Sequence, residues 1–561
     1  MHHHTVLRSS VLLMGIVSMA ALGAACSSAG GESSSSTNEA ANGAASAASI
    51  ARGRDIWLKS TFGGEKLFSL YLPMPPFNLS LGLDAVLVTP RAVRFATWGV
   101  VNDPDCTDGD ASTGGLDRCP DPSATGIVGI RKGPDPTGRR PFLVGVACAG
   151  CHAGLDAQNP PSNPNNPSWD NIHLTTGNQY IQVGKIFGAK LSAHDPRKQV
   201  FQTWAPGTVD TTTIESDGIN NPGIITQFYK IPDRPYFDNH YMGAPENVHR
   251  AGQAGEDDAG CQKAALRVYF NIGMCAAECM LPHLANGPGG TQTPIDDAEC
   301  AARCPDYVQA KADVVDECNF INDSKSTPSP KLQEANGNGD VQIDDGLVAL
   351  GRDVFANNCA SCHSNGQKPK TNDYSDDKMR LATGFNPLFG ERPGEIGTNK
   401  CRSLSTNWST GHIWQNFASD ELHAQKDEIA QGRSYYRDVP LLGIWATAPF
   451  FHNNRLGSYN GDPSISGRLA AFEDAMRLLL NPWERDFAGS VQVTTDSIQV
   501  PTPFGPVTLP AGTPVAAFAN LNPKNPLQNF CPEYVENGGH YYGALLAPEE
   551  KAALTEFLKT L

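Results

Sequence analysis

The chain contains the pattern Cys-x-x-Cys-His twice, at residues 148–152 (CAGCH) and 359–363 (CASCH). This spacing is the attachment signature of c-type haem. Two thiols three residues apart reach the two vinyl groups of one porphyrin, and the histidine that follows gives the iron a nitrogen ligand. The sequence therefore predicts two haems c, with thioether bonds from Cys148, Cys151, Cys359 and Cys362 and iron ligands from His152 and His363.

Two other interpretations of the motifs are weaker. A C-x-x-C pair can also be a redox dithiol or half of a zinc site. Zinc would require further cysteines or histidines nearby, and neither motif has a second pair at zinc-finger spacing. Two such motifs, each followed by its own histidine, favour haem over both alternatives.

Composition limits the kind of protein this can be. A length of 561 residues allows two to four domains with cores of their own. The 55 glycines and 42 prolines indicate that much of the backbone is loop. The net charge of −16, with no long basic run, argues against nucleic acid as a partner. An acidic surface suits a basic electron-transfer partner, but it is also common in ordinary soluble proteins.

The first 26 residues have the features of a bacterial export signal. Arg8 precedes an apolar run at 11–22 that is too short to cross a bilayer. Cys26 resembles the cysteine of a lipobox, with Gly23 where leucine is usual, and residues 27–50 form a Ser-, Ala- and Gly-rich tether. We expect a signal peptide at 1–26 and an exported lipoprotein anchored at the outer membrane, periplasmic or extracellular, whose lipid is its only membrane contact. The alternative is cleavage near Ala25 without an anchor.

The other cysteines predict disulfides. Of fifteen cysteines, Cys26 and the four motif cysteines leave ten, an even number that suits five bridges in an oxidising compartment. Two pairs have C-x3-C spacing, which places both thiols on one face of a helix. Two antiparallel helices of this kind suggest the pairs Cys275–Cys304 and Cys279–Cys300, with Cys261–Cys318 closing the base and Cys106–Cys119 joining one loop. A second metal site is the alternative for the C-x3-C pairs.

Apolar periodicity predicts helices most clearly in the second half. Asp344 or Asp345 can cap a helix that leads into CASCH, with an apolar face made by Leu347, Leu350, Val354 and Phe355. Further helices are predicted at 469–480, ended by Pro482, and at 548–561, and residues 490–520 alternate like a hairpin. In the first half, a short apolar run at 142–146 precedes CAGCH, and the stretches 180–187 and 264–274 have helical patterns.

These patterns predict a mainly α fold made of two cytochrome c-like haem domains, with long irregular loops and a few short strands. The N-terminal haem domain spans 51–335 and includes a Cys-rich insertion at 261–318, and the C-terminal cytochrome c domain spans 336–561. Residues 336–345 (NGNGDVQIDD) resemble a calcium loop, but Leu347 stands at the twelfth position, where such a loop has glutamate. An ordinary interdomain loop is the preferred interpretation, and calcium remains a candidate cofactor.

The sixth ligand of each iron decides what the haem can do. His540 is the best candidate, because it lies in Gly-Gly-His-Tyr-Tyr-Gly, where glycines let the backbone approach a flat macrocycle. The alternative is a histidine on a surface loop. His452, in the aromatic loop APFFHNN, can either line a haem pocket or pack structurally.

The order of export signal, first CxxCH, long insertion, second CxxCH, APFFHNN loop and GGHYYG tail resembles the diheme cytochrome c peroxidase superfamily. Within it, the chain is most similar to the diheme rubber oxygenases that cleave polyisoprene. The resemblance covers roughly residues 120 to 561. It rests on GVACAGCHAG (145–154), TGNQYIQVGKIF (176–187), NNPGI (220–224), RVYFNIG (267–273), CASCHS (359–364), TAPFFHNN (447–454), SGRLAAFEDAM (466–476) and GGHYYGALL (538–546).

The resemblance implies a division of labour between two haems. The first, on His152, would be reactive with an open distal face, and the second, on His363 and His540, would be six-coordinate and pass electrons. Tyr269 and Phe270 would lie near the first haem's pocket, with Phe270 acting in catalysis; the alternative is that they are helix core. Relatives place a tryptophan between the haems, whereas this chain has none between residues 204 and 408.

The expected protein is therefore an exported diheme oxidoreductase. As an oxygenase it would use O2 and an apolar alkene, and His152 and Phe270 would serve the reactive haem. As a peroxidase it would use peroxide and a redox partner protein, and it would need an acid–base residue that the sequence does not locate. The alternative outside catalysis is a pure electron-transfer cytochrome with two six-coordinate haems.

Overall fold

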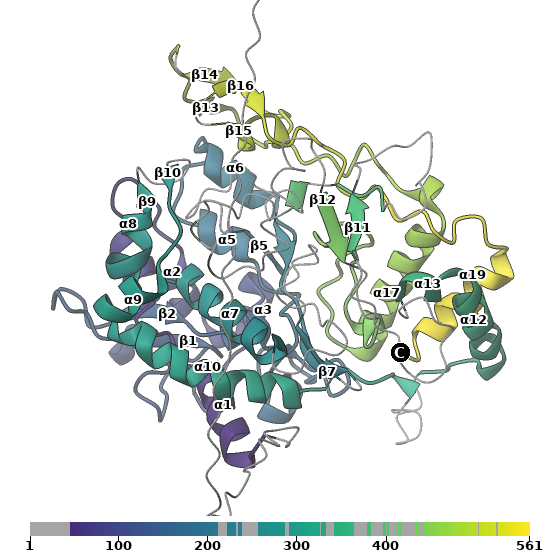
Figure 1. Cartoon of the computed structure of the whole chain (residues 1–561), viewed down its shortest axis with the longest axis horizontal. Coiled ribbons are helices and arrows are strands. Elements are labelled where there is room, and N and C mark those ends of the chain that lie inside the picture. The colour runs from purple at the N-terminus through teal and green to yellow at the C-terminus, as the bar shows by residue number, and fades with distance from the viewer. Residues whose placement is uncertain are drawn as a thin grey trace, which may run out of the picture. The chain divides into compact units, whose positions relative to one another are not determined.

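The computed structural model describes most of the chain from residue 45 onward (Figure 1). The predicted signal peptide, Cys26 and all but the end of the tether lie outside the described residues, as does the first half of the calcium-like loop at 336–345. The first helix begins at Ala47, just inside the range assigned to the tether. The described residues are 45–210, 222–231, 234–237, 256–285, 291–325, 327–331, 341–363, 379–382, 396–399, 401–402, 413, 416, 434–437, 441–502, 504–522 and 525–561.

Helix α10 (Pro305–Asp323) is the helix against which the other long helices of the N-terminal part of the chain pack. Helix α1 (Ala47–Lys59) packs along it, and α7 (Glu256–Asn271) packs against it as well (Figure 1). Their apolar faces meet in one large core, which also holds the first CxxCH motif. The other helical segments here are η1 (Leu67–Tyr71), α2 (Leu83–Val88), α3 (Arg91–Trp98), η2 (Ala111–Thr113), α4 (Ala149–His152), η3 (Trp169–Asn171), α5 (Val183–Gly188), α6 (Pro196–Gln202), η5 (Ala276–Met280), α8 (Leu281–His283) and α9 (Asp297–Arg303).

A second core lies between α12 (Asp345–Asn358), α17 (Ile465–Leu480) and α19 (Pro548–Leu558). Helices α12 and α19 cross closely at Gly351, where a Cβ atom would lie 2.0 Å from the carbonyl oxygen of Ala553. Only glycine allows this approach. The remaining helical segments are α13 (Ala360–His363), η8 (Ile444–Ala446), η9 (Pro482–Glu484) and α18 (Ala516–Ala519).

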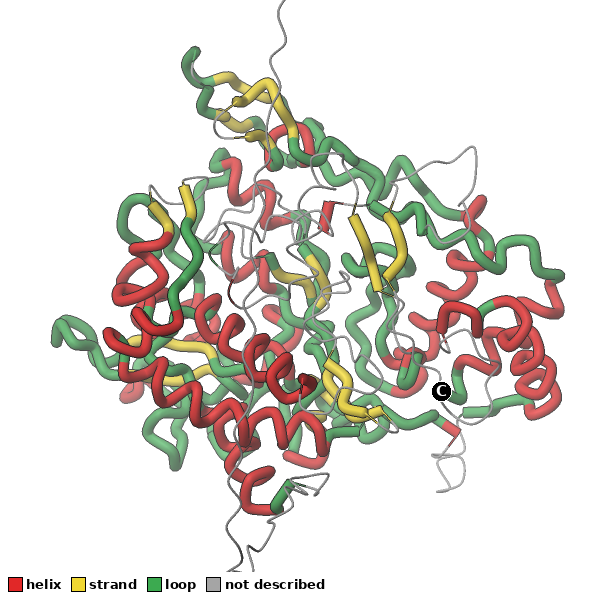
Figure 2. Tube along the Cα trace, viewed as in Figure 1, coloured by secondary structure: helices red, strands yellow, loops and turns green. Residues whose placement is uncertain are grey.

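The strands are short, and among the described residues they pair only as two-stranded antiparallel sheets (Figure 2). In the first of these, Ile130 lies opposite Val146 and Gly133 opposite Leu143. The pairs are β1 (Ile130–Gly133) with β2 (Leu143–Val146), β3 (Gly154–Leu155) with β4 (Ile172–His173), β5 (Thr208–Val209) with β6 (Gly223–Ile224), β7 (Phe228–Ile231) with β8 (Arg234–Phe237), β9 (Leu284–Ala285) with β10 (Thr291–Gln292), β11 (Met379–Ala382) with β12 (Ser434–Arg437), β13 (Ile498–Val500) with β14 (Val507–Leu509), and β15 (Leu521–Asn522) with β16 (Asn525–Asn529).

The described residues thus form a mixed fold in which helices predominate and strands are few and short, so the sequence prediction is confirmed at this level. The helix predicted before CASCH is α12, the one predicted at 469–480 lies within α17, and the one predicted at 548–561 is α19, which ends at Leu558; the hairpin within 490–520 is β13–β14. Asp344 caps α12, since its Oδ1 accepts hydrogen bonds from the backbone N–H groups of Gly346 and Leu347. Leu350 does not join the buried face, because its side chain is 44% exposed.

Five disulfides are present, as the cysteine count predicts. The pairs Cys106–Cys119, Cys261–Cys318, Cys275–Cys304 and Cys279–Cys300 are those expected from spacing, and Cys401–Cys531 is the fifth. Five bridges indicate an oxidising, exported environment. No single helix among the described residues is long and apolar enough to cross a membrane, although the bent pair Cys261–Asn271 and Ala276–His283 passes the same test on length and composition.

Candidate functional site

The first CxxCH motif follows directly from the β1–β2 hairpin. Strand β2 ends at Val146, and the backbone N–H of Ala147 donates to the carbonyl of Gly129, 2.7 Å away, just before the motif. The motif then forms the single turn α4, whose backbone N–H groups at Cys151 and His152 donate to the carbonyl of Cys148. Cys148 is buried and joins the first core, and Cys151 is half-buried.

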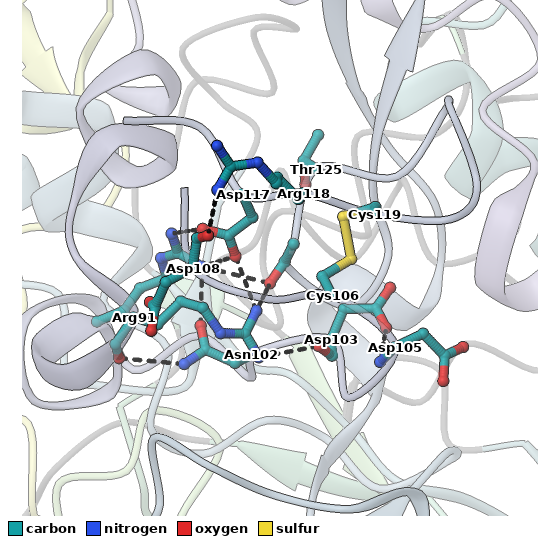
Figure 3. A network of polar contacts seen from close by, with 12 residues as sticks. Arg91, Asn102, Asp103, Asp105, Cys106, Asp108, Asp117, Arg118, Cys119 and Thr125 are labelled. Carbon is teal, nitrogen blue, oxygen red and sulfur yellow. Dashed lines mark hydrogen bonds and ion pairs between the residues drawn. A yellow bond between two sulfur atoms is a disulfide. The ribbon is translucent and has the colours of Figure 1, made fainter. Parts of the chain in front are cut away.

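A network of buried charges holds the loop that leads into this hairpin (Figure 3). The Asp117 carboxylate is 2% exposed and lies 2.7 Å from Nη1 of Arg91 and 3.0 Å from Nη1 of Arg94. Both arginines also donate to the carbonyl of Gly126, four residues before β1 begins. Figure 3 shows the Cys106–Cys119 disulfide beside the same network. The support of the first motif is therefore fixed by ion pairs and a covalent bridge together.

His152 is oriented as a metal ligand would be. Its Nδ1 lies 2.8 Å from the carbonyl oxygen of Thr226, so Nδ1–H donates there and Nε2 keeps its lone pair. The ring packs against Phe228 and Trp57, with centroids 4.8 and 5.9 Å away. Burial lowers the pKa of His152 to about 4, which keeps the imidazole neutral, as ligation requires.

A buried acid that no local sequence pattern indicates lies beside the first motif. Glu317 of α10 is fully buried, and its Oε1 accepts a hydrogen bond of 3.0 Å from the hydroxyl of Tyr269. Both side chains also interact with the Cys148 thiol. Burial raises the pKa of the Glu317 carboxyl to about 7, against the hydrogen bonds from Cys148 and Tyr269, which lower it. The carboxyl therefore exchanges a proton near neutral pH.

Phe270, the predicted catalytic partner of His152, lies in α7 within the first core. It is fully buried and stacks on Tyr307 of α10, with centroids 5.4 Å apart and ring planes 29° from parallel. This contact belongs to helix packing, and a catalytic role for Phe270 stays a prediction.

The second CxxCH motif follows from the end of α12. Cys359 caps that helix, and the backbone N–H groups of Cys362 and His363 donate to its carbonyl, both at 3.0 Å. Ala360 is buried in the second core. Burial raises the pKa of the Cys359 thiol to about 12. None of the five disulfides takes up a cysteine of either motif, so the four thiols that haem attachment needs are left to it.

His540 faces His363, although 177 residues separate them in the sequence. Their ring centroids are 6.4 Å apart, with ring planes at 41°. The loop is held close to residues 396–398, because the His540 N–H donates to the carbonyl of Ile396 at 2.7 Å. Gly539 has a φ of 93°, and a Cβ there would lie 2.4 Å from the backbone nitrogen of Thr398. The glycine before His540 is therefore required by a close approach and a left-handed backbone.

The separation of these two rings fits one metal ion between them. Two metal–nitrogen bonds of about 2 Å, plus about 1.1 Å from each nitrogen to its ring centre, place the centroids roughly 6 Å apart. The buried Nδ1 of His540 has no hydrogen-bond partner among the described residues. Burial, followed by the charges of His363 and Arg485, lowers the pKa of His540 to about 3, so the ring is neutral. Two neutral imidazoles to bind an iron and two nearby thiols to bond the porphyrin vinyl groups are the groups that a six-coordinate haem c requires.

His452 is packed rather than paired with a motif histidine. It is 4% exposed and stacks on Tyr436, with centroids 4.8 Å apart and planes at 27°. Burial, and then the charge of Arg402, lowers the pKa of His452 to about 3. Its carbonyl accepts a hydrogen bond of 2.7 Å from the N–H of Ile224, two residues before Thr226. His452 thus supports the segment that orients His152.

Hydrogen bonds join the surroundings of the two motifs. The Asn178 N–H donates to the carbonyl of Cys151 at 2.8 Å, and Nε2 of the neighbouring Gln179 donates to the carbonyl of Ala446 at 2.8 Å. A second link runs through Pro328, whose carbonyl accepts from Nε2 of Gln158 and from Nε1 of the fully buried Trp445. Residues near the first motif therefore contact the core that holds the second.

A separate metal site in the Cys-rich insertion is not supported, because both C-x3-C pairs form disulfides. Within the described part of the chain, the group of potential ligands closest together is Cys401, Cys531 and Glu533, and its two thiols are also joined in a disulfide. A scan against protein-family models finds no match to the chain, and a search of curated proteins finds no similar sequence.

Proposed function

We propose that the chain is an exported diheme c-type cytochrome with oxidoreductase activity. The haem on His152 would activate dioxygen for the cleavage of an apolar alkene such as polyisoprene, and the haem on His363 and His540 would transfer electrons. The observation that carries this proposal is the difference between the two motif histidines. His363 faces a second imidazole at 6.4 Å, whereas His152 is packed against Trp57 and Phe228.

The residues around the first motif suit a reactive iron. When bound, the haem supplies an iron that can hold an oxygen ligand at its sixth position. Thr226 fixes the tautomer of His152, and this orients the ligand and increases its basicity. Trp57 and Phe228 cover the imidazole with apolar surface and keep water from it. Glu317 lies beside Cys148, and its burial raises the pKa of its carboxyl, which favours the protonated form.

Glu317 also favours a second candidate, a diheme cytochrome c peroxidase. A peroxidase needs an acid–base group whose pKa is close to the working pH. The sequence did not locate such a group, and the buried Glu317 beside the first motif has the required pKa of about 7. Peroxide and a reduced redox partner protein would then be the substrates. The rival without catalysis is an electron carrier, in which both irons would be six-coordinate.

The five disulfides place the mature protein in an oxidising compartment, and we extend this to a lipid anchor on Cys26. An acylated protein partitions into detergent, and Cys26→Ser should release it or stop its processing. A mature protein that starts at a residue other than Cys26 would contradict the lipid anchor. The haem assignment does not depend on this result.

Two substrate pairs decide between the activities. Purified protein is incubated with polyisoprene and O2, and separately with hydrogen peroxide and a reduced cytochrome. Oxygen-dependent formation of aldehyde and ketone chain ends selects the oxygenase, and peroxide-dependent oxidation of the cytochrome selects the peroxidase. His152→Ala should abolish either activity. If neither reaction occurs and neither haem binds CO, the protein is an electron carrier.

A further inference from the structure

Arg485 is a buried arginine immediately behind the loop that carries His540. It follows η9 and is 5% exposed. A guanidinium has five N–H donors in a fixed fork. Backbone carbonyls accept from all three of its nitrogens, at Leu478, Leu479, Asn537, Gly539 and His540, with distances of 2.8, 3.1, 3.1, 2.7 and 3.5 Å.

These carbonyls come from two segments that are distant in the sequence. Leu478 and Leu479 lie in the last turn of α17, where carbonyl groups have no partner within the helix. Asn537, Gly539 and His540 belong to the loop that faces His363. One side chain thus joins the end of a core helix to the loop of the predicted ligand, and its positive charge is favourable at a helix C-terminus.

Two aromatic rings enclose the guanidinium. Its carbon lies 5.2 Å from the ring centroid of Tyr541 and 5.7 Å from that of Phe451. Tyr541 is the residue after His540, and Phe451 precedes His452. The rings stabilise the cation through their π faces and keep it in one place.

The loop needs this support, because its backbone is strained. His540 has a φ of 50°, a conformation that residues other than glycine adopt only when surrounding contacts hold them there. The hydrogen bond from its N–H to Ile396 fixes one side of the peptide. Arg485 fixes the other side, through the carbonyls of Gly539 and His540.

We propose that Arg485 is the positioning residue for His540, holding its imidazole within bonding distance of the second iron, and that its charge raises the reduction potential of that haem. The inference rests on the proposed function, since it requires His540 to be an iron ligand. Reduction adds an electron to the iron, and a cation in a low-dielectric surrounding favours the reduced state.

The test compares two variants of Arg485 with a matched control. Arg485→Met removes the charge and the fork, and Arg485→Lys keeps the charge and removes the fork. The control is Arg477→Met in α17, whose side chain is 50% exposed and pairs with Asp474 and Glu484 at the surface. The readouts on the full-length holoprotein are the low-spin haem signal, CO binding by the reduced second haem, and the midpoint potential of that haem.

In Arg485→Met we expect part of the second haem to become high-spin and bind CO, and the midpoint potential of the fraction that keeps both histidine ligands to fall. Added imidazole should restore the low-spin signal, and a far-UV circular dichroism spectrum like that of the wild type would exclude a general loss of folding. Arg485→Lys should also gain CO binding, with a potential closer to that of the wild type. Arg477→Met should change none of these.

Two results separate the failure of this inference from that of the proposed function. If wild-type protein has no haem with two histidine ligands, the proposed function fails before Arg485 is considered. If wild-type protein has a haem with two histidine ligands, but neither Arg485 variant gains CO binding at the second haem, the proposed positioning role of Arg485 is wrong. An unchanged potential in Arg485→Met removes the electrostatic role. Should Arg485→Met not fold, Arg485→Lys decides the positioning role by the same CO criterion.

Discussion

The two CxxCH motifs, CAGCH and CASCH, differ at one of their five positions, yet the surroundings of their histidines differ. His152 donates to the carbonyl of Thr226 and is covered by Trp57 and Phe228. His363 faces the imidazole of His540 at 6.4 Å. Within the described residues, no imidazole is paired with His152 in this way. The difference teaches that two nearly identical motifs have different surroundings, because residues distant in the chain decide what lies beside each motif histidine.

The supports of the two motifs differ as well. Four of the five disulfides lie between residues 106 and 318, and the buried ion pairs around Asp117 lie in the same part of the chain (Figure 3). The second motif rests on the α12–α19 packing, and its partner histidine comes from a loop held by hydrogen bonds. We infer that the surroundings of the first motif, proposed to hold the reactive haem, are rigid. The surroundings of the second motif, proposed to hold the electron-transfer haem, depend on one loop.

The largest effect is expected from removing the attachment thiols. Cys151→Ala and Cys362→Ala should each remove one of the two thioether bonds of a haem and impair its attachment, and the double variant should lose most of its covalent haem, because each vinyl group needs its own thiol. Denatured protein on a gel stained for haem gives the measurement. Cys106→Ala, which breaks a disulfide instead, should keep both haems. Undiminished stain in the double variant would contradict the assignment.

The second effect separates the two irons. His540→Ala should leave the second haem with one histidine, so that it becomes high-spin and binds CO, while CO binding by the first haem is unchanged. Turnover should fall because electrons arrive more slowly, whereas His152→Ala should abolish it. Absorption spectra with and without CO record the change. His283→Ala on α8 is the control and should match the wild type; a second haem that stays low-spin in His540→Ala would show that another ligand holds it.

The third effect concerns the support of the first motif. Asp117→Asn leaves Arg91 and Arg94 without their buried carboxylate, and we expect a loss of about 3–5 kcal/mol in the free energy of unfolding. Urea denaturation followed by circular dichroism measures it. Asp110→Asn removes an exposed partner of Arg118 and should have a much smaller effect. Equal effects of the two substitutions would mean that the buried network does not stabilise this region.

The smallest effect is a pH dependence that comes from the first region. The pKa of Glu317 is raised from 4.5 to about 7, so the folded state binds the proton more tightly than the unfolded state. The resulting stabilisation is present below pH 4.5 and is lost as the pH rises to about 7, a change of roughly 3 kcal/mol. Glu317→Gln should flatten the stability curve over this range, and Glu299→Gln, on the partly exposed α9, should not. A stability that falls by the same amount between pH 5 and 7 in the wild type and in Glu317→Gln would contradict this origin.

Much of the fold follows from local sequence, and the site follows from it only in part. Local spacing of residues predicts several features of the fold. These are the cap at Asp344, the helices at 465–480 and 548–558, and four disulfide pairs. Thr226, Glu317 and Arg485 have no such signal, because their roles arise where segments distant in the chain meet. Leu350 fits the apolar period of its helix but is largely exposed.

The measurement closest to the central claim is the absorption spectrum of the reduced wild-type protein before and after CO is added. An open sixth position binds CO, and a position filled by histidine does not. In the wild type we expect CO to shift the absorption bands of one of the two haems. In His540→Ala that haem should still respond to CO, and the second haem should respond as well. If neither haem of the wild type shifts, or both do, the contrast between His152 and the His363–His540 pair does not describe this protein.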